Sequence, residues 1–477
     1  MKKAQVVFIP SPGVGHIVST LEFAKLLINR DNRLRITVLI MKFPNTTETD
    51  LYTKPLPISD SLNLINLPEC SLPPNMDRRS AMMALLEAQK PNVKQAVSNL
   101  TMGEAQHGSL AAFVVDMFCT PMIDIAKEFF VPTLVFFTSG VALLGLMFHL
   151  HTIHERDSVD STQLLQLTEL VVPSFANPVP INSFPSIVLE KEWESFLMGY
   201  WKGLKNADGI IVNSFEELES HAVHSFVFDA DLASLPIYPV GPILNLEPKT
   251  KGSVDSDDII KWLDDQPSSS VIFLCFGSRG SFYEDQIKEI AYAIEKSGVS
   301  FIWALRKAPP RGTMDAPSNY SLFHFESILP KGFLDRTAKI GRVVGWAPQA
   351  QILAHPATGG FVSHCGWNST LEGIYFGVPI ATWPLSAEQP TNAFELVCEL
   401  KMAVEIALDY RVGYTGEHNY VVNAEKIERG IRSVLSKDEE IRKKVKEMSE
   451  KSRKTLLKGG SSYNYLGRLI DYIMNQI

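Results

Sequence analysis

The chain has 477 residues, of which 45% are hydrophobic and 21% are charged. This composition is typical of a globular protein with room for two domains and argues against a disordered one. The formal net charge of −8, without a run of basic residues, argues against nucleic acid as a partner. The five cysteines form no Cys-x-x-Cys pair, which favours a reducing, cytoplasmic location over a disulfide framework.

Strand-like and helix-like segments alternate in the first half of the chain. We predict a strand at Gln5–Ile9 and a helix at Ile17–Ile28, followed by a strand at Arg35–Met41. A further strand is expected at Leu110–Val115 and a helix at Met122–Phe129. This βαβα alternation predicts an α/β fold class, with a parallel sheet covered by helices on both faces.

The segment Pro10–His16 joins the first predicted strand to the first helix. Ligands of doubly wound sheets bind at the carboxyl ends of strands, where His16 can act as a proton acceptor near neutral pH. Asp116 ends the strand Leu110–Val115 at the same edge of the predicted sheet. A carboxylate bonded to one imidazole nitrogen leaves the other to accept a proton, so His16 and Asp116 are candidate catalytic residues.

Two other interpretations of these residues stay open. A dinucleotide fingerprint needs a third glycine and an acid after the second strand, whereas the chain has Val18 and Lys42. A nicotinamide-dependent oxidoreductase is therefore disfavoured. Alternatively, His16 and Asp116 only cap the helices that follow them.

The segment Val131–Leu150 is nearly uncharged and about as long as a membrane span. We interpret it as a buried strand at Thr133–Phe137 and a buried helix at Val141–Leu150, so no transmembrane segment is expected. The apolar run that starts at Val6 is too short for a signal peptide.

The second half of the chain repeats the alternation after a boundary near Ile237–Pro242. We expect a surface loop at Arg306–Ser327, an exposed charged helix at Glu439–Lys454 and an amphipathic segment at Tyr463–Ile477. The other predicted elements are Val271–Cys275, Glu284–Lys296, Ser300–Leu305, Phe361–Ser363, Pro379–Trp383 and Ala403–Ile406. The predicted parts are an N-terminal domain at 1–245, a linker at 246–258, a C-terminal domain at 259–459 and a C-terminal helix at 460–477 that docks back on the body.

The segment Trp346–Gln389 concentrates aromatic and polar residues around one strand-to-helix turn. Strand Phe361–Ser363 runs into His364 and then a helix, whose amides and positive dipole end form an anion site. Trp346 offers a flat face on which a planar ring can stack, and Glu372 can accept hydrogen bonds from hydroxyl groups.

This segment resembles the signature box of the plant family 1 UDP-dependent glycosyltransferases. The histidine loop before the first helix, Val240-Gly241-Pro242 and Phe276-Gly277-Ser278 also match, so the resemblance covers nearly the whole chain. It implies the GT-B arrangement of two Rossmann-like doubly wound domains facing each other across a cleft. It further implies a monomer that needs no cofactor or metal and inverts the anomeric configuration of UDP-glucose.

The resemblance also assigns roles to residues of the box. Contacts with uridine are implied for Trp346, Ala347 and Gln349, and with ribose for Glu372. Contacts with the phosphates are implied for Ser278, His364, Asn368 and Ser369, and with the sugar for Trp367, Glu388 and Gln389. The amide of Gln389 is expected to offer a donor and an acceptor to two hydroxyls of glucose. Gln351 and Ser386 depart from the family's usual residues.

The implied acceptor is a small lipophilic plant metabolite of the flavonoid, phenylpropanoid, lignan or triterpenoid class. Its pocket in the N-terminal domain has apolar candidates, for each of which ordinary core packing is the alternative. They are Met117, Phe118, Phe148, Phe184, Trp193, Leu197 and Tyr200. A non-catalytic UDP-sugar-binding or metabolite-binding protein remains the alternative function of another class.

Two patterns resemble metal sites without completing one. Asp229-Ala230-Asp231 resembles the D-x-D of metal-dependent glycosyltransferases, but it is far in sequence from the box and is interpreted as a solvated turn. Three histidines at 149, 151 and 154 end an apolar helix without an H-E-x-x-H pattern.

Overall fold

The structure is a computed structural model with two compact units, which are described separately. The first comprises Met1–Val159, Glu192–Asn245 and Lys454–Ile477, and the second comprises Asp160–Lys191 and Leu246–Arg453. The residues described are 2–44, 61–73, 76, 78–102, 108–229, 232–233, 235–246, 254–310, 316–320, 322–412, 420–436 and 439–477. Most of the predicted linker and Asp231 lie outside them.

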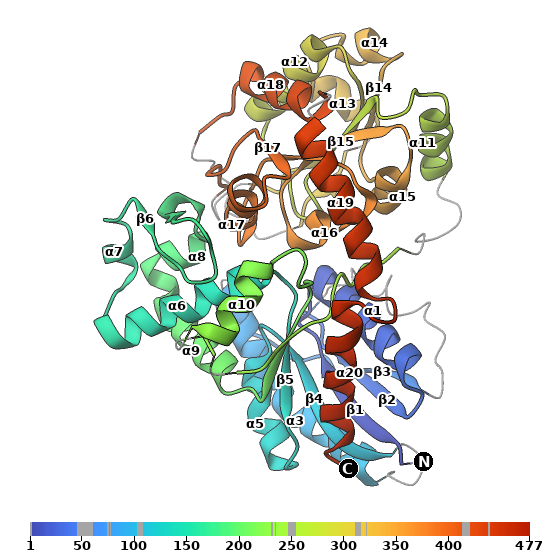
Figure 1. The fold of residues 1–477 in the computed structure, drawn as a ribbon. Coiled ribbons are helices and arrows are strands. Elements are labelled where there is room, and N and C mark those ends of the chain that lie inside the picture. The colour runs from blue at the N-terminus through green and yellow to red at the C-terminus, as the bar shows by residue number, and fades with distance from the viewer. Residues whose placement is uncertain are drawn as a thin grey trace. The chain divides into compact units, whose positions relative to one another are not determined.

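The first unit is built on a seven-stranded parallel sheet with the order β3-β2-β1-β4-β5-β8-β9 (Figure 1). The order reverses between β1 and β4, as in doubly wound folds. The strands are β1 Ala4–Ile9, β2 Leu34–Ile40, β3 Leu62–Asn66, β4 Ser109–Asp116, β5 Thr133–Phe137, β8 Gly209–Val212 and β9 Ile237–Pro239.

Helices of the first unit bury one apolar face against this sheet. Ile17, Leu21 and Ala24 of α1 share one helical face and join the core with Val6 and Phe8 of β1. The C-terminal helix α20 adds Leu466, Leu469, Ile470 and Ile473 to the same core. The helices are α1 Val14–Arg30, α3 Arg78–Met102, η1 Thr120–Met122, α5 Ile123–Glu128, α6 Val141–Asp157, α9 Glu194–Lys205, α10 Ser220–Phe228 and α20 Ser461–Met474.

The second unit repeats this topology in a six-stranded parallel sheet with the order β14-β11-β10-β15-β16-β17. The order reverses between β10 and β15, which therefore correspond to β1 and β4. The strands are β10 Val271–Cys275, β11 Ser300–Ala304, β14 Gly341–Val344, β15 Thr358–Ser363, β16 Ile380–Thr382 and β17 Ala403–Glu405.

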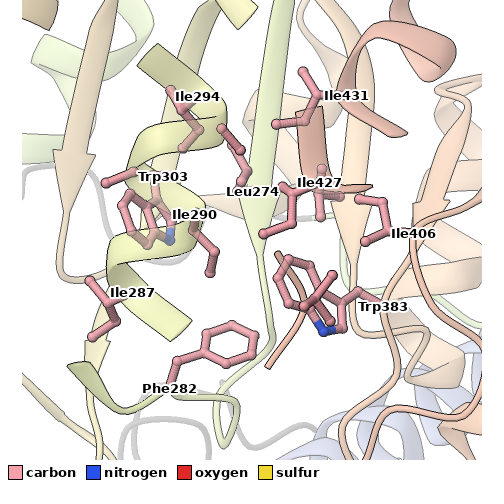
Figure 2. Packing of buried hydrophobic residues seen from close by; sticks show 14 of the residues in the cluster. Leu274, Phe282, Ile287, Ile290, Ile294, Trp303, Trp383, Ile406, Ile427 and Ile431 are labelled. Carbon is pink, nitrogen blue, oxygen red and sulfur yellow. The ribbon is translucent and has the colours of Figure 1, made fainter. Parts of the chain in front are cut away.

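Two helices of the second unit close one core over this sheet. Figure 2 shows Ile287, Ile290 and Ile294 of α12 facing the cluster that includes the buried rings of Trp303 and Trp383. Ile427 and Ile431 of α18 complete the same cluster. The helices are α11 Val254–Asp264, α12 Glu284–Ser297, α13 Leu322–Ile328, α14 Phe333–Thr337, α15 Gln349–Ala354, α16 Trp367–Phe376, α17 Gln389–Phe394, η4 Glu395–Glu399, α18 Ala424–Leu435 and α19 Glu439–Thr455.

One segment groups with a different unit from the one that its place in the chain suggests. Residues 160–191, predicted as part of the N-terminal domain, cluster with the second unit. The carboxylate of Glu399 accepts hydrogen bonds from the backbone N–H groups of Ala176 and Asn177, both at 2.9 Å. Arg411 donates to the carbonyl oxygens of Asn182 and Phe184. The elements here are α7 Ser161–Leu164, β6 Glu169–Leu170, β7 Val179–Pro180, η2 Ile181–Ser183 and α8 Ser186–Leu189, followed by η3 Lys191–Trp193.

The predicted strand at Thr133–Phe137 is observed with those bounds, and the apolar helix after it is α6. None of the described helices is both long and apolar enough to cross a membrane. The expected loop at Arg306–Ser327 is wrong in part, because it contains a two-stranded ribbon and most of helix α13. Phe325 of α13 is buried in the core of the second unit, so this part of the segment packs on the domain instead of forming a surface loop. The ribbon strands are β12 Arg306–Lys307 and β13 Ser318–Asn319.

Candidate active site

The predicted site residues lie at the point in each sheet where the strand order reverses. In the first unit, His16 lies on α1 just after β1, and Asp116 is the last residue of β4. In the second unit, Ser278 follows β10 and His364 follows β15 directly. The segments that follow two such neighbouring strands run to opposite faces of the sheet. A crevice that can hold a ligand therefore forms beside the carboxyl ends of these strands.

His16 and Asp116 form a hydrogen-bonded pair. The distance between Nδ1 of His16 and Oδ2 of Asp116 is 2.7 Å, and the Asp116 side chain is fully buried while that of His16 is 27% exposed. The second carboxylate oxygen of Asp116 accepts the backbone N–H of Phe118 at 3.0 Å. Because an ionised carboxylate can only accept, Nδ1 carries the proton and Nε2 carries the lone pair that can accept another.

Thr138 is a neighbour of this pair that the sequence interpretation missed. It follows β5, and its Oγ1 lies 3.2 Å from Nδ1 of His16 and donates to the sulfur of Met117 at 3.5 Å. Thr138 is the first polar residue after β5, which pairs with β4, but the sequence does not show which residue of 138–140 faces His16. The predicted bounds leave Thr138 between the strand Thr133–Phe137 and the helix Val141–Leu150.

A row of aromatic rings extends from His16. Phe118 lies 5.4 Å from the ring of His16 and 5.7 Å from Tyr200, measured between ring centroids. Phe196, which the sequence interpretation also missed, stacks on Tyr200 at 6.3 Å and contacts Trp193 at 5.7 Å. All these residues belong to the first unit.

Tyr200 has an unusual environment for a tyrosine. Its side chain is buried, and its hydroxyl has no hydrogen-bond partner among the described residues. Burial, and secondarily the charge of Asp116, raise the pKa of Tyr200 well above its ordinary value. A buried hydroxyl without a hydrogen-bond partner destabilises the folded protein. A polar atom of a ligand that bonds this hydroxyl would therefore bind favourably.

The other candidates for the acceptor pocket are less uniform. Met117 and Leu197 are both buried. Met117 directly follows β4 and precedes Phe118, and Leu197 lies on α9 next to Phe196 in sequence. Phe148 of α6 is fully buried and packs on Phe226 of α10 at 5.9 Å, which is core packing. Phe184 is also fully buried, but it belongs to the segment that clusters with the second unit.

In the second unit, His364 is enclosed by two glycines. A Cβ atom added at Gly277 or at Gly366 would lie 2.6 Å or 2.5 Å from Nε2 of His364, so a larger residue at either position would displace the imidazole. Gly277 also has a φ of +73°, which side chains disfavour. Nδ1 of His364 is buried without a hydrogen-bond partner among the residues described. Burial lowers the pKa of His364 to about 4, so the ring is neutral near pH 7.

Gln349 links two other residues of the box. Its Nε2 donates to Oγ of Ser369 at 2.9 Å and to Oε2 of Glu372 at 2.8 Å. These bonds join the start of α15 to the first turns of α16 and leave the carbonyl oxygen of Gln349 for another partner. Trp346, just before α15, is 45% exposed, whereas Ala347 is buried.

The remaining residues of the box lie around the starts of α16 and α17. Trp367 is 3% exposed, Asn368 is half-buried and Ser278 is exposed. Gln389 begins α17, and its Oε1 accepts the backbone N–H groups of Leu385 and Ser386 at 2.9 and 3.0 Å. Because these two bonds engage the carbonyl oxygen, the NH2 group is the part of this amide that remains for a sugar.

The described residues of the two metal-like patterns have other partners. Asp229 ends α10 and accepts the backbone N–H of Leu232 at 3.3 Å. His151 lies 3.4 Å from the exposed carboxylate of Glu155, and Nδ1 of His154 bonds the carbonyl of Val159. Among the residues that the structure describes, no group of three or more His, Cys, Asp or Glu side chains is arranged to hold a metal ion.

Comparison with known proteins decides the family. Residues 250–409 match the family described as UDP-glucoronosyl and UDP-glucosyl transferase. The chain is 50% identical to UDP-glucose flavonoid 3-O-glucosyltransferase 6 of Fragaria ananassa, over 99% of each chain. The chain belongs to plant family 1 of the UDP-dependent glycosyltransferases.

Solved structures agree with this assignment. A transferase of Siraitia grosvenorii in complex with UDP superposes with a TM-score of 0.87 at 44% identity, over 99% of this chain and 100% of that one. UGT71G1 of Medicago truncatula complexed with UDP-glucose gives 0.85 at 38% identity, over 99% and 98%. The glycosyltransferase thus has the GT-B fold class with two Rossmann-like domains. It is an enzyme, which excludes the oxidoreductase and the non-catalytic binding protein.

Proposed function

We propose that this glycosyltransferase transfers glucose from UDP-glucose to a hydroxyl of a small lipophilic plant metabolite, with inversion at the anomeric carbon. The observation that carries the proposal is the pair of His16 and Asp116, 2.7 Å apart at the strand-order reversal of the first unit. The donor assignment is supported by the Fragaria ananassa relative, named for UDP-glucose, and by the Medicago truncatula structure with that donor.

The second unit supplies the groups that bind UDP-glucose. The uracil stacks on the exposed face of Trp346, and the carbonyl oxygen of Gln349 accepts a hydrogen bond from the nucleotide. The carboxylate of Glu372, held by Gln349, accepts from ribose hydroxyls. Phosphate contacts come from Ser278, His364, Asn368 and Ser369, with Ala347 beside the uridine and with Trp367, Glu388 and Gln389 at the sugar.

The diphosphate is stabilised without a resident metal ion. Helix α16 has ten residues and begins after Gly366. Its positive dipole end is therefore close to His364 in the chain. His364 is neutral near pH 7 and contributes a hydrogen-bond donor rather than a charge. These groups stabilise the negative charge that grows on UDP as it leaves.

The chemical step is a single displacement. Nε2 of His16 takes the proton of the acceptor hydroxyl while the hydroxyl oxygen forms a bond to the anomeric carbon of glucose. The bond from that carbon to the UDP oxygen breaks, and its electrons leave with UDP. The buried carboxylate of Asp116 stabilises the imidazolium that forms, which later loses its proton to water. An α-linked donor therefore gives a β-glucoside.

The acceptor class follows from the surroundings of His16. A row of aromatic rings that begins at Phe118 favours a planar aromatic acceptor, because offset and tilted ring contacts add to apolar burial. The buried hydroxyl of Tyr200 then bonds a second polar atom of that acceptor. Flavonoids have both features, as do some phenylpropanoids and lignans, whereas triterpenoids lack the aromatic rings.

The enzyme works as a cytoplasmic monomer in this proposal. The five cysteines, at positions 70, 119, 275, 365 and 398, are free thiols, as expected in a reducing compartment.

The product identifies the reaction. The purified enzyme, mixed with UDP-glucose and a panel of flavonols, lignans and triterpenoids, should release UDP and form glucosides of the phenolic acceptors. Proton NMR of the product should show the large coupling constant of a β-anomeric proton. An α-glucoside would refute the single displacement, and UDP release without any glucoside would refute transfer to these acceptors.

A further inference from the structure

Asn392 is a buried polar residue without a role in the site described so far. It lies on α17, three positions after Gln389, and is 1% exposed. Its Nδ2 donates a hydrogen bond to the carbonyl oxygen of Cys365 at 2.9 Å. The short helix that begins with Gln389 is thereby tied to the loop between β15 and α16.

Cys365 occupies a strained position in that loop. Its φ is +61°, in the left-handed region that residues with a Cβ disfavour. Two hydrogen bonds from side chains hold its backbone there, and its thiol also donates to the carbonyl of Ser363 at 3.5 Å. Its N–H donates to Oγ of Ser363 at 3.1 Å, and its carbonyl accepts from Asn392. Both partners are buried, so water does not compete for these bonds.

The conformation of Cys365 sets the positions of its two neighbours. His364 precedes it, and Gly366, the N-cap of α16, follows it. The ring of His364 has little room, because a Cβ at Gly366 would lie 2.5 Å from its Nε2. A small rotation of the Cys365 peptide groups would therefore move both the imidazole and the start of α16.

The same helix also holds the loop beyond β16, through the hydrogen bonds from Leu385 and Ser386 to Gln389. Residues three apart on a helix lie on neighbouring positions of its surface, so Gln389 and Asn392 act from one side of α17.

We propose that Asn392 is a positioning residue that holds Ser363–Gly366, here called the diphosphate loop, in its binding conformation. Because Asn392 and Gln389 both lie on α17, Asn392 also fixes the position of this loop relative to Gln389. The proposal rests on the proposed function, because it assumes that the loop binds the diphosphate of the donor.

Calorimetry with uridine and with UDP separates this role from a general structural one. Asn392→Leu keeps the side-chain volume and removes the donor, so the affinity for UDP should fall about tenfold or more. The affinity for uridine should stay within about twofold, because Trp346, Gln349 and Glu372 are untouched. Ser363→Ala removes the other side-chain hydrogen bond to the backbone of Cys365. It should weaken UDP binding in the same selective way, even if Asn392→Leu does not fold.

Thr391→Val is the matched control on the same helix. Oγ1 of Thr391 donates to the carbonyl of Ser183 at 2.7 Å and not to the diphosphate loop. This variant should leave the affinity for UDP unchanged. Wild-type affinity for UDP in both Asn392→Leu and Ser363→Ala, or equal losses for uridine and UDP, would overturn the proposal. A wild-type enzyme that binds no UDP would instead refute the proposed function.

Discussion

Oε1 of Gln389 accepts a hydrogen bond from the backbone N–H of Ser386 at 3.0 Å. Because Leu385 donates to the same oxygen, the carbonyl of this side chain is already hydrogen-bonded within the protein. Its NH2 group is therefore the part that can bond a sugar. The two halves of one amide thus have separate tasks, and substitutions can separate them.

Gln389→Glu tests the task of the NH2 group. The variant keeps an oxygen for Leu385 and Ser386 but loses the donor to adjacent hydroxyls of glucose. Wild type should prefer UDP-glucose over UDP-galactose by about ten- to a hundredfold in kcat/KM, because galactose leaves an N–H unpaired, at roughly 1–3 kcal/mol. The variant should lose much of that margin.

The measurement is a competition between the two donors for one acceptor. Gln389→Ala should lose the same margin and also melt at a lower temperature than Gln389→Glu, because the loop at 385–386 loses its acceptor. If Gln389→Glu kept the wild-type donor ratio, another residue such as Glu388 would set the choice of sugar.

His364 should make the enzyme sensitive to acid. Its pKa is about 4 in the folded protein because of burial, against about 6.5 for an unfolded histidine. Between these values the unfolded state binds a proton that the folded state does not, so stability falls as the pH decreases through this window. The full loss from this residue is roughly 3 kcal/mol.

His364→Asn removes this proton uptake on unfolding. Its free energy of unfolding, measured in urea, should decrease less than that of wild type between about pH 7 and about pH 4.5. Equal decreases in the two proteins would show that His364 is not held neutral by burial.

Tyr200→Phe should separate stability from acceptor binding. The variant loses a buried hydroxyl that has no partner among the described residues, so the free enzyme should be as stable as wild type or up to about 1 kcal/mol more stable. The KM for a flavonol with several hydroxyls should rise about three- to tenfold, since a hydrogen bond is lost.

An acceptor with a single phenol group is the control, and its KM should not change. The comparison needs thermal melting and steady-state kinetics with both acceptors. A KM that rises equally for both would place the hydroxyl of Tyr200 away from the second polar group of the acceptor.

Activity should survive treatment with EDTA. The start of α16 and His364 stabilise the negative charge of the leaving diphosphate, and neither needs a metal ion. Initial rates with UDP-glucose before and after chelation should agree. Complete loss of activity with EDTA, restored by Mg²⁺ or Mn²⁺, would contradict this prediction. It would make Asp229 a candidate metal ligand.

The sequence predicted those features that depend on local pattern. Alternating strands and helices place His16 after β1 and Asp116 at the end of β4, and the pairing of those strands then brings the two side chains together. The signature box likewise located the residues around α15 and α16.

Features that depend on distant hydrogen bonds escaped prediction. Glu399 bonds Asn177 across 222 positions of sequence, and so draws residues 160–191 to the second unit. The engagement of Gln389 by the loop before it was also invisible, because it depends on the turn after β16. Thr138 was missed because the short polar break after β5 gives no sign of which residue points to His16.

Asp116→Asn tests the support that the carboxylate gives to His16. The variant keeps the shape of the side chain but removes the charge that stabilises the imidazolium. Its kcat should fall, though less than that of a variant without the imidazole, while its affinity for UDP-glucose stays the same. A silent substitution, measured in steady-state kinetics, would mean that Asp116 has only a structural role.

The proposed mechanism depends most on the base function of His16. Kinetics with a weakly acidic alcohol as acceptor, together with calorimetric binding of UDP-glucose, test it on His16→Ala. We expect unchanged affinity for UDP-glucose and a kcat lower by about a hundredfold to ten-thousandfold, the usual contribution of general base catalysis. A variant that kept the full kcat with this acceptor would contradict this function of His16.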